Sequence, residues 1–128
     1  MPSYSEIIGL PPNFRVSYSL FGPEEGGRRS PHFQHIRWDF SYEDETIAPR
    51  NWLFMIWPEF ITPSGKLLPE NEPMPRHGLA DMFIISNERR IFHCQHIKPG
   101  VRGFMHEGKR IGVCEVVEVL DLHTNPQS

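Results

Sequence analysis

Prolines constrain the fold of this 128-residue chain more than any other feature of its sequence. There are 13 of them, and because a proline inside an α-helix removes a hydrogen bond and breaks the helix, long uninterrupted helices are disfavoured. The segments between the prolines instead alternate apolar and polar residues. In Phe14–Leu20 the polar residues Arg15, Ser17 and Ser19 alternate with the apolar ones and are predicted to face away from them. Ile36–Tyr42 repeats this pattern, and Ser41 is among its residues predicted to face outward. A period of two predicts half-buried strands.

Further strands are predicted along the rest of the chain, with a turn at Asn87–Arg90. They lie at Trp52–Trp57, Leu79–Ser86, Ile91–Ile97, Phe104–His106 and Ile111–Leu120. Short strands, Gly/Pro turns and no helical period predict an all-β fold, either a small antiparallel barrel or a sandwich. We expect residues 1–13 to form an N-terminal lead-in, 14–120 to form a single domain, and 121–128 to be a frayed tail.

The composition is that of an ordinary soluble domain, with 38% hydrophobic residues and a net charge of −3. This charge argues against a general nucleic-acid binder but allows a local basic patch. No apolar run is long enough for a membrane helix, and the first residues do not resemble a secretion signal. Cys94 and Cys114 are expected to be buried thiols. We therefore expect a cytoplasmic protein without a membrane partner.

Two charged glycine motifs lie near opposite ends of the predicted domain. Glu24–Pro31 reads Glu-Glu-Gly-Gly-Arg-Arg-Ser-Pro, and Gly103–Arg110 reads Gly-Phe-Met-His-Glu-Gly-Lys-Arg. Together, and in this order, they resemble motifs of the C-terminal β-barrel, the third domain, of the translation elongation factor Tu family. Trp38 stands where that family usually has proline. The resemblance implies a six-stranded antiparallel Greek-key β-barrel that lacks the family's GTPase domain.

The resemblance also implies a contact surface. In the family, residues of these two motifs contact the T-stem backbone of aminoacyl-tRNA, which by matched position carries over to Arg28, Arg29, Glu107 and Gly108. Arg29 replaces the usual histidine and Lys109 the usual glycine. The family also uses this barrel in protein contacts, with its own GTPase domain and with its exchange factor.

The distribution of charge agrees with a contact surface near the second motif. Residues 88–110 hold only two acidic residues but many of the basic ones: Arg89, Arg90, Lys98, Arg102, Lys109 and Arg110. If the two motifs lie close together, they form a positive patch that offers backbone amides to phosphates. The predicted partner-binding or phosphate-binding residues are Arg28, Arg29, Arg102, Glu107, Gly108, Lys109 and Arg110. The alternatives are a solvated charged face and a rigid turn held by Glu–Arg pairs.

The segment from Trp52 to Pro75 departs most from the family, because it inserts aromatic residues and a proline-rich loop. The inserted rings have two interpretations: they cover a barrel surface that other domains would otherwise cover, or they form a partner interface. The candidate interface residues are Trp52, Phe54, Trp57 and Phe60. The same surface would serve a homo-oligomer.

Catalytic motifs are lacking in the sequence. It has no Gly-x-x-x-x-Gly-Lys-Ser/Thr phosphate loop, so we expect no GTPase activity and no nucleotide cofactor. On a strand, His93 and His96 would face opposite ways, and Cys94 with His96 would supply two ligands where structural zinc takes four. We therefore expect no metal and no other cofactor. An enzyme or ligand-binding barrel with a pocket of His93, His96, His106 or Cys114 is the alternative.

These features predict a non-catalytic module that binds a macromolecule through Glu24–Pro31 and Phe104–Ile111. The partner is either a protein or the backbone of tRNA or rRNA. The net negative charge favours a protein, because specific tRNA binders normally carry a stronger positive bias.

Overall fold

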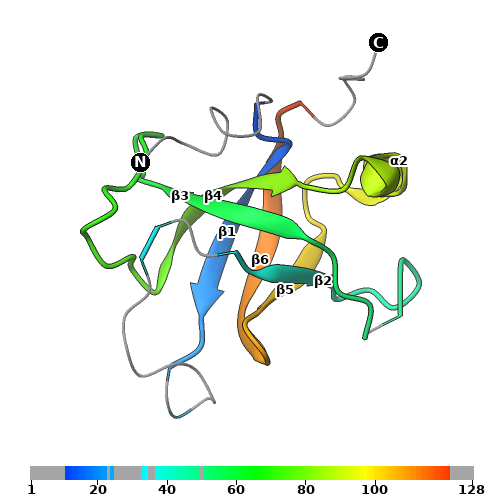
Figure 1. Cartoon of the computed structure of the whole chain (residues 1–128), viewed down its shortest axis with the longest axis horizontal. Helices are drawn as coiled ribbons and strands as arrows, with labels where there is room; N and C mark the ends of the chain where they lie inside the picture. The colour runs from blue at the N-terminus through cyan, green and yellow to red at the C-terminus, as the bar shows by residue number, and fades with distance from the viewer. Residues whose placement is uncertain (1–10, 23, 25–32, 35–36, 50, 122–128) are drawn as a thin grey trace.

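The computed structural model describes residues 11–22, 24, 33–34, 37–49 and 51–121 (Figure 1). Within them the chain forms short strands and the helix α2. In chain order the elements are β1 (Phe14–Leu20), β2 (Asp39–Tyr42), β3 (Ile56–Ile61), β4 (His77–Ile84), α2 (Asn87–His96), β5 (Arg102–His106) and β6 (Arg110–Val119).

The strands form one six-stranded antiparallel sheet in the order β2-β5-β6-β1-β4-β3. The sheet curls, and an antiparallel bridge joins Phe40 in the edge strand β2 to Phe54, just before the other edge strand, β3. The Phe40 amide donates to the Phe54 carbonyl at 2.9 Å, and the Phe54 amide donates back at 2.8 Å. Around the curled sheet β2, β3 and β4 follow one another and β1 lies beside β4, which is a Greek-key arrangement. The prediction of a small antiparallel Greek-key β-barrel is confirmed.

The core of the barrel begins with the alternation in β1. Phe14, Val16, Tyr18 and Leu20 are all buried, as their period of two predicts, and β1 pairs with β4 on one side and β6 on the other. Aromatic rings from other strands pack edge-on against this row, with the Tyr18 and Phe60 centroids 5.1 Å apart. Each fully buried large side chain contributes about 1.5–3 kcal/mol through the area it removes from water.

Side-chain amides secure the strand ends. The Gln34 side chain pairs with the backbone of the edge strand β3: its Nε2 donates to the Phe60 carbonyl and its Oε1 accepts from the Phe60 amide, both at 2.7 Å. The Asn13 side chain accepts a hydrogen bond from the amide of Ile84, at the end of β4. These bonds satisfy backbone groups that the sheet leaves unpaired.

The predicted turn at Asn87–Arg90 and strand at Ile91–Ile97 are wrong, because this stretch forms the helix α2. The residues that it buries are Arg90, His93 and Ile97, and Ile91 is 73% exposed. Spacings of three and four residues are those of one helical face, not of a strand. The segment lies between Pro75 and Pro99, where no proline interrupts it. In Figure 1 the helix lies beside the barrel, beyond the end of β4.

Two details of the predicted strands need correction. The strand expected at Trp52–Trp57 begins at Ile56 and continues through Pro58 to Ile61. A proline is compatible with an edge strand, where its missing amide costs no ladder bond. In β2, Ser41 was predicted to face outward but is fully buried. Its hydroxyl lies 2.7 Å from Nε2 of His106, which satisfies the buried oxygen.

Candidate functional site

The predicted contact surface combines two motifs, of which the structure describes one. Arg28 and Arg29 lie outside the described residues, as does most of the Glu24–Pro31 loop. The approach of this loop to the second motif therefore stays a prediction. The second motif forms the end of β5, the turn at Glu107–Lys109 and the start of β6. We call these last residues, His106 to Arg110, the hairpin end.

Gly108 gives the hairpin end its shape. Its φ of 73° lies in the left-handed region that favours glycine, and a Cβ added there would have no atom within 4 Å. The Glu107 amide donates to the Lys109 carbonyl at 2.8 Å, which closes the turn. The need for glycine is therefore conformational, and the space around this backbone is open.

Glu107 anchors the hairpin end to the core. Its Oε2 accepts a hydrogen bond of 2.7 Å from the indole Nε1 of Trp38, a residue that is only 1% exposed. A buried indole donor without an acceptor would cost about 1–3 kcal/mol. Glu107 thus holds the hairpin end in place while its neighbours remain at the surface.

Lys109 and Arg110 supply positive charge at this point. Lys109 is exposed, and the Arg110 guanidinium carbon lies 4.0 Å from the centre of the Phe104 ring, a cation–π contact within the hairpin. Arg110 also lowers the pKa of His106, after the larger effect of burial. Among the described residues neither base forms an ion pair with a carboxylate. The hairpin end therefore presents two cations, one of them oriented by an aromatic ring.

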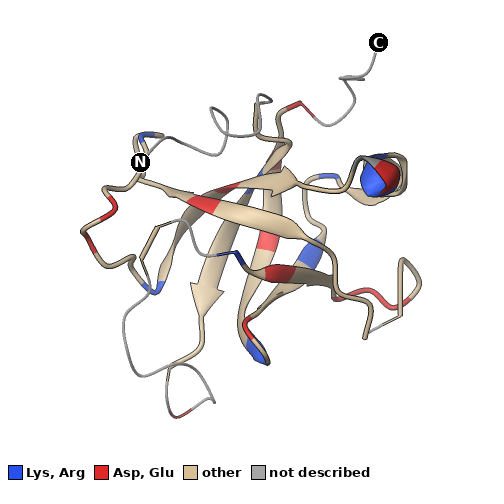
Figure 2. Ribbon diagram, viewed as in Figure 1, with Lys and Arg blue, Asp and Glu red and all other residues tan. Residues whose placement is uncertain are grey.

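Arg102 belongs to a different surface. It begins β5, whereas the hairpin turn follows the other end of that strand, about 13 Å away at 3.3 Å per residue. Its Nε lies 3.4 Å from Oε2 of Glu43. Figure 2 shows the basic residues of α2, of β5 and of the hairpin end at separate places. The single positive patch inferred from residues 88–110 is therefore divided in the folded protein.

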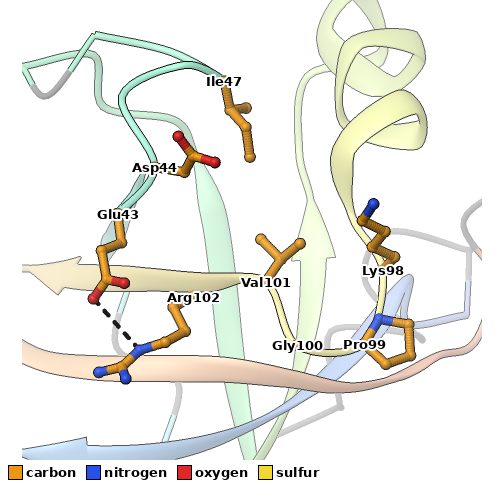
Figure 3. A pocket seen from close by; sticks show the side chains of 8 residues that line it. All are labelled: Glu43, Asp44, Ile47, Lys98, Pro99, Gly100, Val101 and Arg102. Carbon is orange, nitrogen blue, oxygen red and sulfur yellow. Dashed lines mark ion pairs between the residues drawn. The ribbon is translucent and has the colours of Figure 1, made fainter.

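A pocket of about 400 Å³ surrounds Arg102 (Figure 3). Its charged residues are Glu43, Asp44 and Arg102 on one side, where Arg102 pairs with Glu43, and Lys98 on the other. Asp44 also accepts hydrogen bonds from the Thr46 amide and hydroxyl, which lower the pKa of its carboxyl group. The pocket is lined by two acidic and two basic side chains, so it has no preference for one sign of ligand charge.

The aromatic insertion is divided between core and surface. Phe54 and Phe60 were candidate interface residues, but both are buried, at 7% and 1% exposure, and they fill the barrel. Trp52 is 48% exposed, and its apolar neighbours Leu53 and Met55 are equally open. Trp57 is half-buried beneath the Arg37 guanidinium, which lies 4.7 Å from the ring centre. Phe54 and Phe60 therefore belong to the core, and an interface through Trp52 stays a prediction.

The pair of Tyr42 and His93 was not predicted. His93 is completely buried, and its Nδ1 lies 2.6 Å from the Tyr42 hydroxyl. Burial lowers the pKa of His93 to about 4, with further lowering by Arg89, His96 and Arg90. Nε2 of the same ring has no hydrogen-bond partner among the residues that the structure describes. A helical reading of this stretch would have placed His93 on one face with Arg90 and Ile97, but it would not have identified Tyr42 as the partner.

Of the other residues of the alternative pocket, His96 lies near His93, since both rings contact Tyr42, but His106 lies apart from them. His106 bonds to Ser41, and His93 bonds to Tyr42. Ser41 and Tyr42 are adjacent in β2, and adjacent residues of a strand point to opposite faces of the sheet. Burial raises the pKa of the Cys114 thiol to about 12, so it is not a thiolate at neutral pH. No group of three or more His, Cys, Asp or Glu side chains that could hold a metal ion occurs in the described ranges.

Comparisons with known proteins add no relative. No protein-family model matches this sequence, and the search of curated proteins gives no significant match. Among the described residues, no helix has both the length and the apolar character needed to cross a membrane.

Proposed function

We propose that the protein is a non-catalytic module that binds a macromolecule through the hairpin end. Lys109 and Arg110 would make the charged contacts, and the Glu24–Pro31 loop would add Arg28 and Arg29. One observation carries the proposal: these two cations stand at the surface on a turn that Glu107 fastens to the buried Trp38. Residues held in place before binding lose less conformational freedom when a partner arrives.

A relation to the third domain of elongation factor Tu would account for this arrangement. It rests on the Glu24–Pro31 and Gly103–Arg110 motifs, and a Greek-key barrel is the fold that it requires. Under this proposal the protein has a role connected with translation, without the GTPase activity of the factor.

A protein is the favoured partner. The net charge of −3 gives no general attraction to RNA, and the exposed Trp52, Leu53 and Met55 offer apolar contacts that a phosphate backbone would not use. RNA remains the second outcome of the test. We propose no catalytic role, because His93 is engaged with Tyr42 and His106 with Ser41, at separate places.

The test is a pull-down with the full chain, performed with and without RNase and analysed for both protein and RNA. We expect a protein that resists RNase, and its recovery should fall about 10-fold or more in Lys109→Glu/Arg110→Glu, because two favourable charges become repulsive. Lys66→Glu, in the β3–β4 connection, is the matched control and should bind normally. Recovery of RNA that RNase abolishes would establish the second partner class. Full binding by the double variant would refute the proposed surface.

A further inference from the structure

A second pocket lies between the segment before β3 and the first turns of α2. It has a volume of about 160 Å³. Its apolar lining comes from Leu53, Phe54, Met55 and Ile84, and its polar lining from Ser86, Arg89 and His93. Sites for drug-sized ligands enclose about 300–1,000 Å³, so this pocket fits only a small molecule or a single side chain.

The His93 ring supplies the pocket with an unused donor. Burial raises the pKa of the Tyr42 hydroxyl, so this group keeps its proton. Nδ1 of His93 is the acceptor for that proton, because the hydroxyl has no other hydrogen-bond partner among the described residues. The imidazole is neutral at physiological pH, and a neutral ring that accepts at Nδ1 carries its hydrogen on Nε2. That N–H is buried and has no partner within the described part of the chain. Buried donors of this kind call for an explanation such as a missing ligand.

The charge around the pocket is positive. Arg89 lines it, and Arg89, Arg90 and His96 all act on His93 in the direction expected of nearby positive charge. None of the described residues that line the pocket is acidic. Ser86 precedes the first turn of α2, and its side chain makes no capping hydrogen bond, so the hydroxyl is available at the positive end of the helix dipole. These groups together favour an anion.

We propose that this pocket binds a small apolar carboxylate. One carboxylate oxygen accepts from Nε2–H of His93 and the other from the Arg89 guanidinium, while a short hydrocarbon group packs against Leu53 and Met55. Both apolar residues are about half exposed, at 50% and 51%, and form the entrance. Methionine and arginine side chains are flexible, so rotamer changes at Met55 and Arg89 would let the ligand reach the buried Nε2 of His93. The site is separate from the hairpin end, although its entrance shares Leu53 and Met55 with the apolar surface proposed for a protein partner.

The experiment is an NMR titration of the ¹⁵N-labelled full chain with 3-methylbutanoate, with 3-methylbutanamide as a neutral probe of the same shape. We expect a saturable shift of the His93 Nε2 resonance and of the backbone amides at the start of α2. The amide should bind about 10-fold more weakly or worse, because it carries no negative charge to pair with Arg89 and has one acceptor oxygen where the carboxylate has two. A peptide ending in leucine, with a free or an amidated terminus, shows whether the carboxylate can come from a chain end.

Two variants keep the test decisive. Arg89→Gln should weaken binding about 10-fold and is expected to fold normally, because Arg89 is exposed. His93→Phe keeps a ring of similar shape among Tyr42, Phe54 and Phe92 and should abolish the saturable response. Lys98→Gln, beyond the end of α2, is the matched control and should bind as the wild type does. Equal binding of acid and amide, or unchanged binding by Arg89→Gln, would overturn the proposal, as would the lack of any saturable response to the acid and to both peptides.

Discussion

The hairpin end and the region around α2 both place basic residues beside aromatic rings, but they do so in opposite ways. At the hairpin end the polar anchor, Glu107, is satisfied by Trp38, and the cations Lys109 and Arg110 stay at the surface. Around α2 the polar group, His93, is buried with a ring nitrogen that has no partner in the described part of the chain. The comparison shows that a surface charge needs only a rigid support, whereas a buried donor needs a partner. It is for this reason that we propose a large partner for the first region and a small ligand for the second.

The largest effect is expected where the hairpin meets the barrel. A Cβ added at Gly103 would lie 2.6 Å from the Ser41 carbonyl oxygen and would collide with the Phe40 ring. Gly103→Ala should therefore lower the free energy of unfolding by about 3 kcal/mol, the upper range for overpacking. Gly108→Ala meets no atom and should cost only about 1 kcal/mol, from its left-handed backbone. Urea unfolding measures both, and equal losses would contradict this account of the hairpin.

The α2 region should dominate the response to acid. The pKa of His93 is about 4 in the folded protein and 6.5 in the reference state, because burial, Arg89, His96 and Arg90 all disfavour its charged form. Below pH 6.5 the unfolded chain binds a proton at His93, whereas the folded protein binds this proton only below about pH 4. The free energy of unfolding should therefore fall with decreasing pH, by about 2 kcal/mol between pH 7 and pH 5.

His93→Gln isolates this contribution, since glutamine cannot titrate. Its free energy of unfolding should be lower than that of the wild type at pH 7, and the difference should narrow by about 2 kcal/mol at pH 5. Urea unfolding at the two pH values provides the measurement. If the free energy of unfolding falls by the same amount from pH 7 to pH 5 in the wild type and in His93→Gln, His93 is not the group that causes the fall.

The smallest effect concerns the anchor of the hairpin end. Glu107→Ala leaves the buried Trp38 indole without this acceptor and should cost about 1 kcal/mol. Glu107→Gln retains an acceptor oxygen and should stay within about 0.5 kcal/mol of the wild type. Chemical denaturation gives the energies, and the indole N–H resonance of Trp38 reports the bond itself. A Trp38 resonance that Glu107→Ala leaves unchanged would rule out the anchor.

The parts of the fold that the sequence predicts are those where one face of a strand is buried. In β1 the alternation of Phe14, Val16, Tyr18 and Leu20 decides both the strand and its inward face. The glycine of the hairpin turn was also predictable, because few residues other than glycine tolerate a φ of 73°. In these places local preference and the tertiary structure agree.

The rest depends on contacts between distant segments. The stretch Asn87–Ile97 mixes charged and apolar residues, and its buried positions include Arg90 and His93, which hydropathy alone assigns to the surface. Its helix is stabilised by packing on Phe54 and Tyr42, and these lie far away in the sequence. The Tyr42–His93 pair could not be predicted while this stretch was taken for a strand. Arg102 and the hairpin end are likewise separated because they lie at opposite ends of β5.

The contrast between the two regions rests most directly on the state of one ring. A long-range ¹H–¹⁵N correlation spectrum of the histidine side chains at neutral pH, without added ligand, reports which nitrogen of His93 carries the proton. We predict a neutral imidazole with its proton on Nε2 and an unprotonated Nδ1 that accepts from Tyr42. A proton on Nδ1, or a charged imidazolium at neutral pH, would contradict the assignment of an unused buried donor and with it the distinction drawn between α2 and the hairpin end.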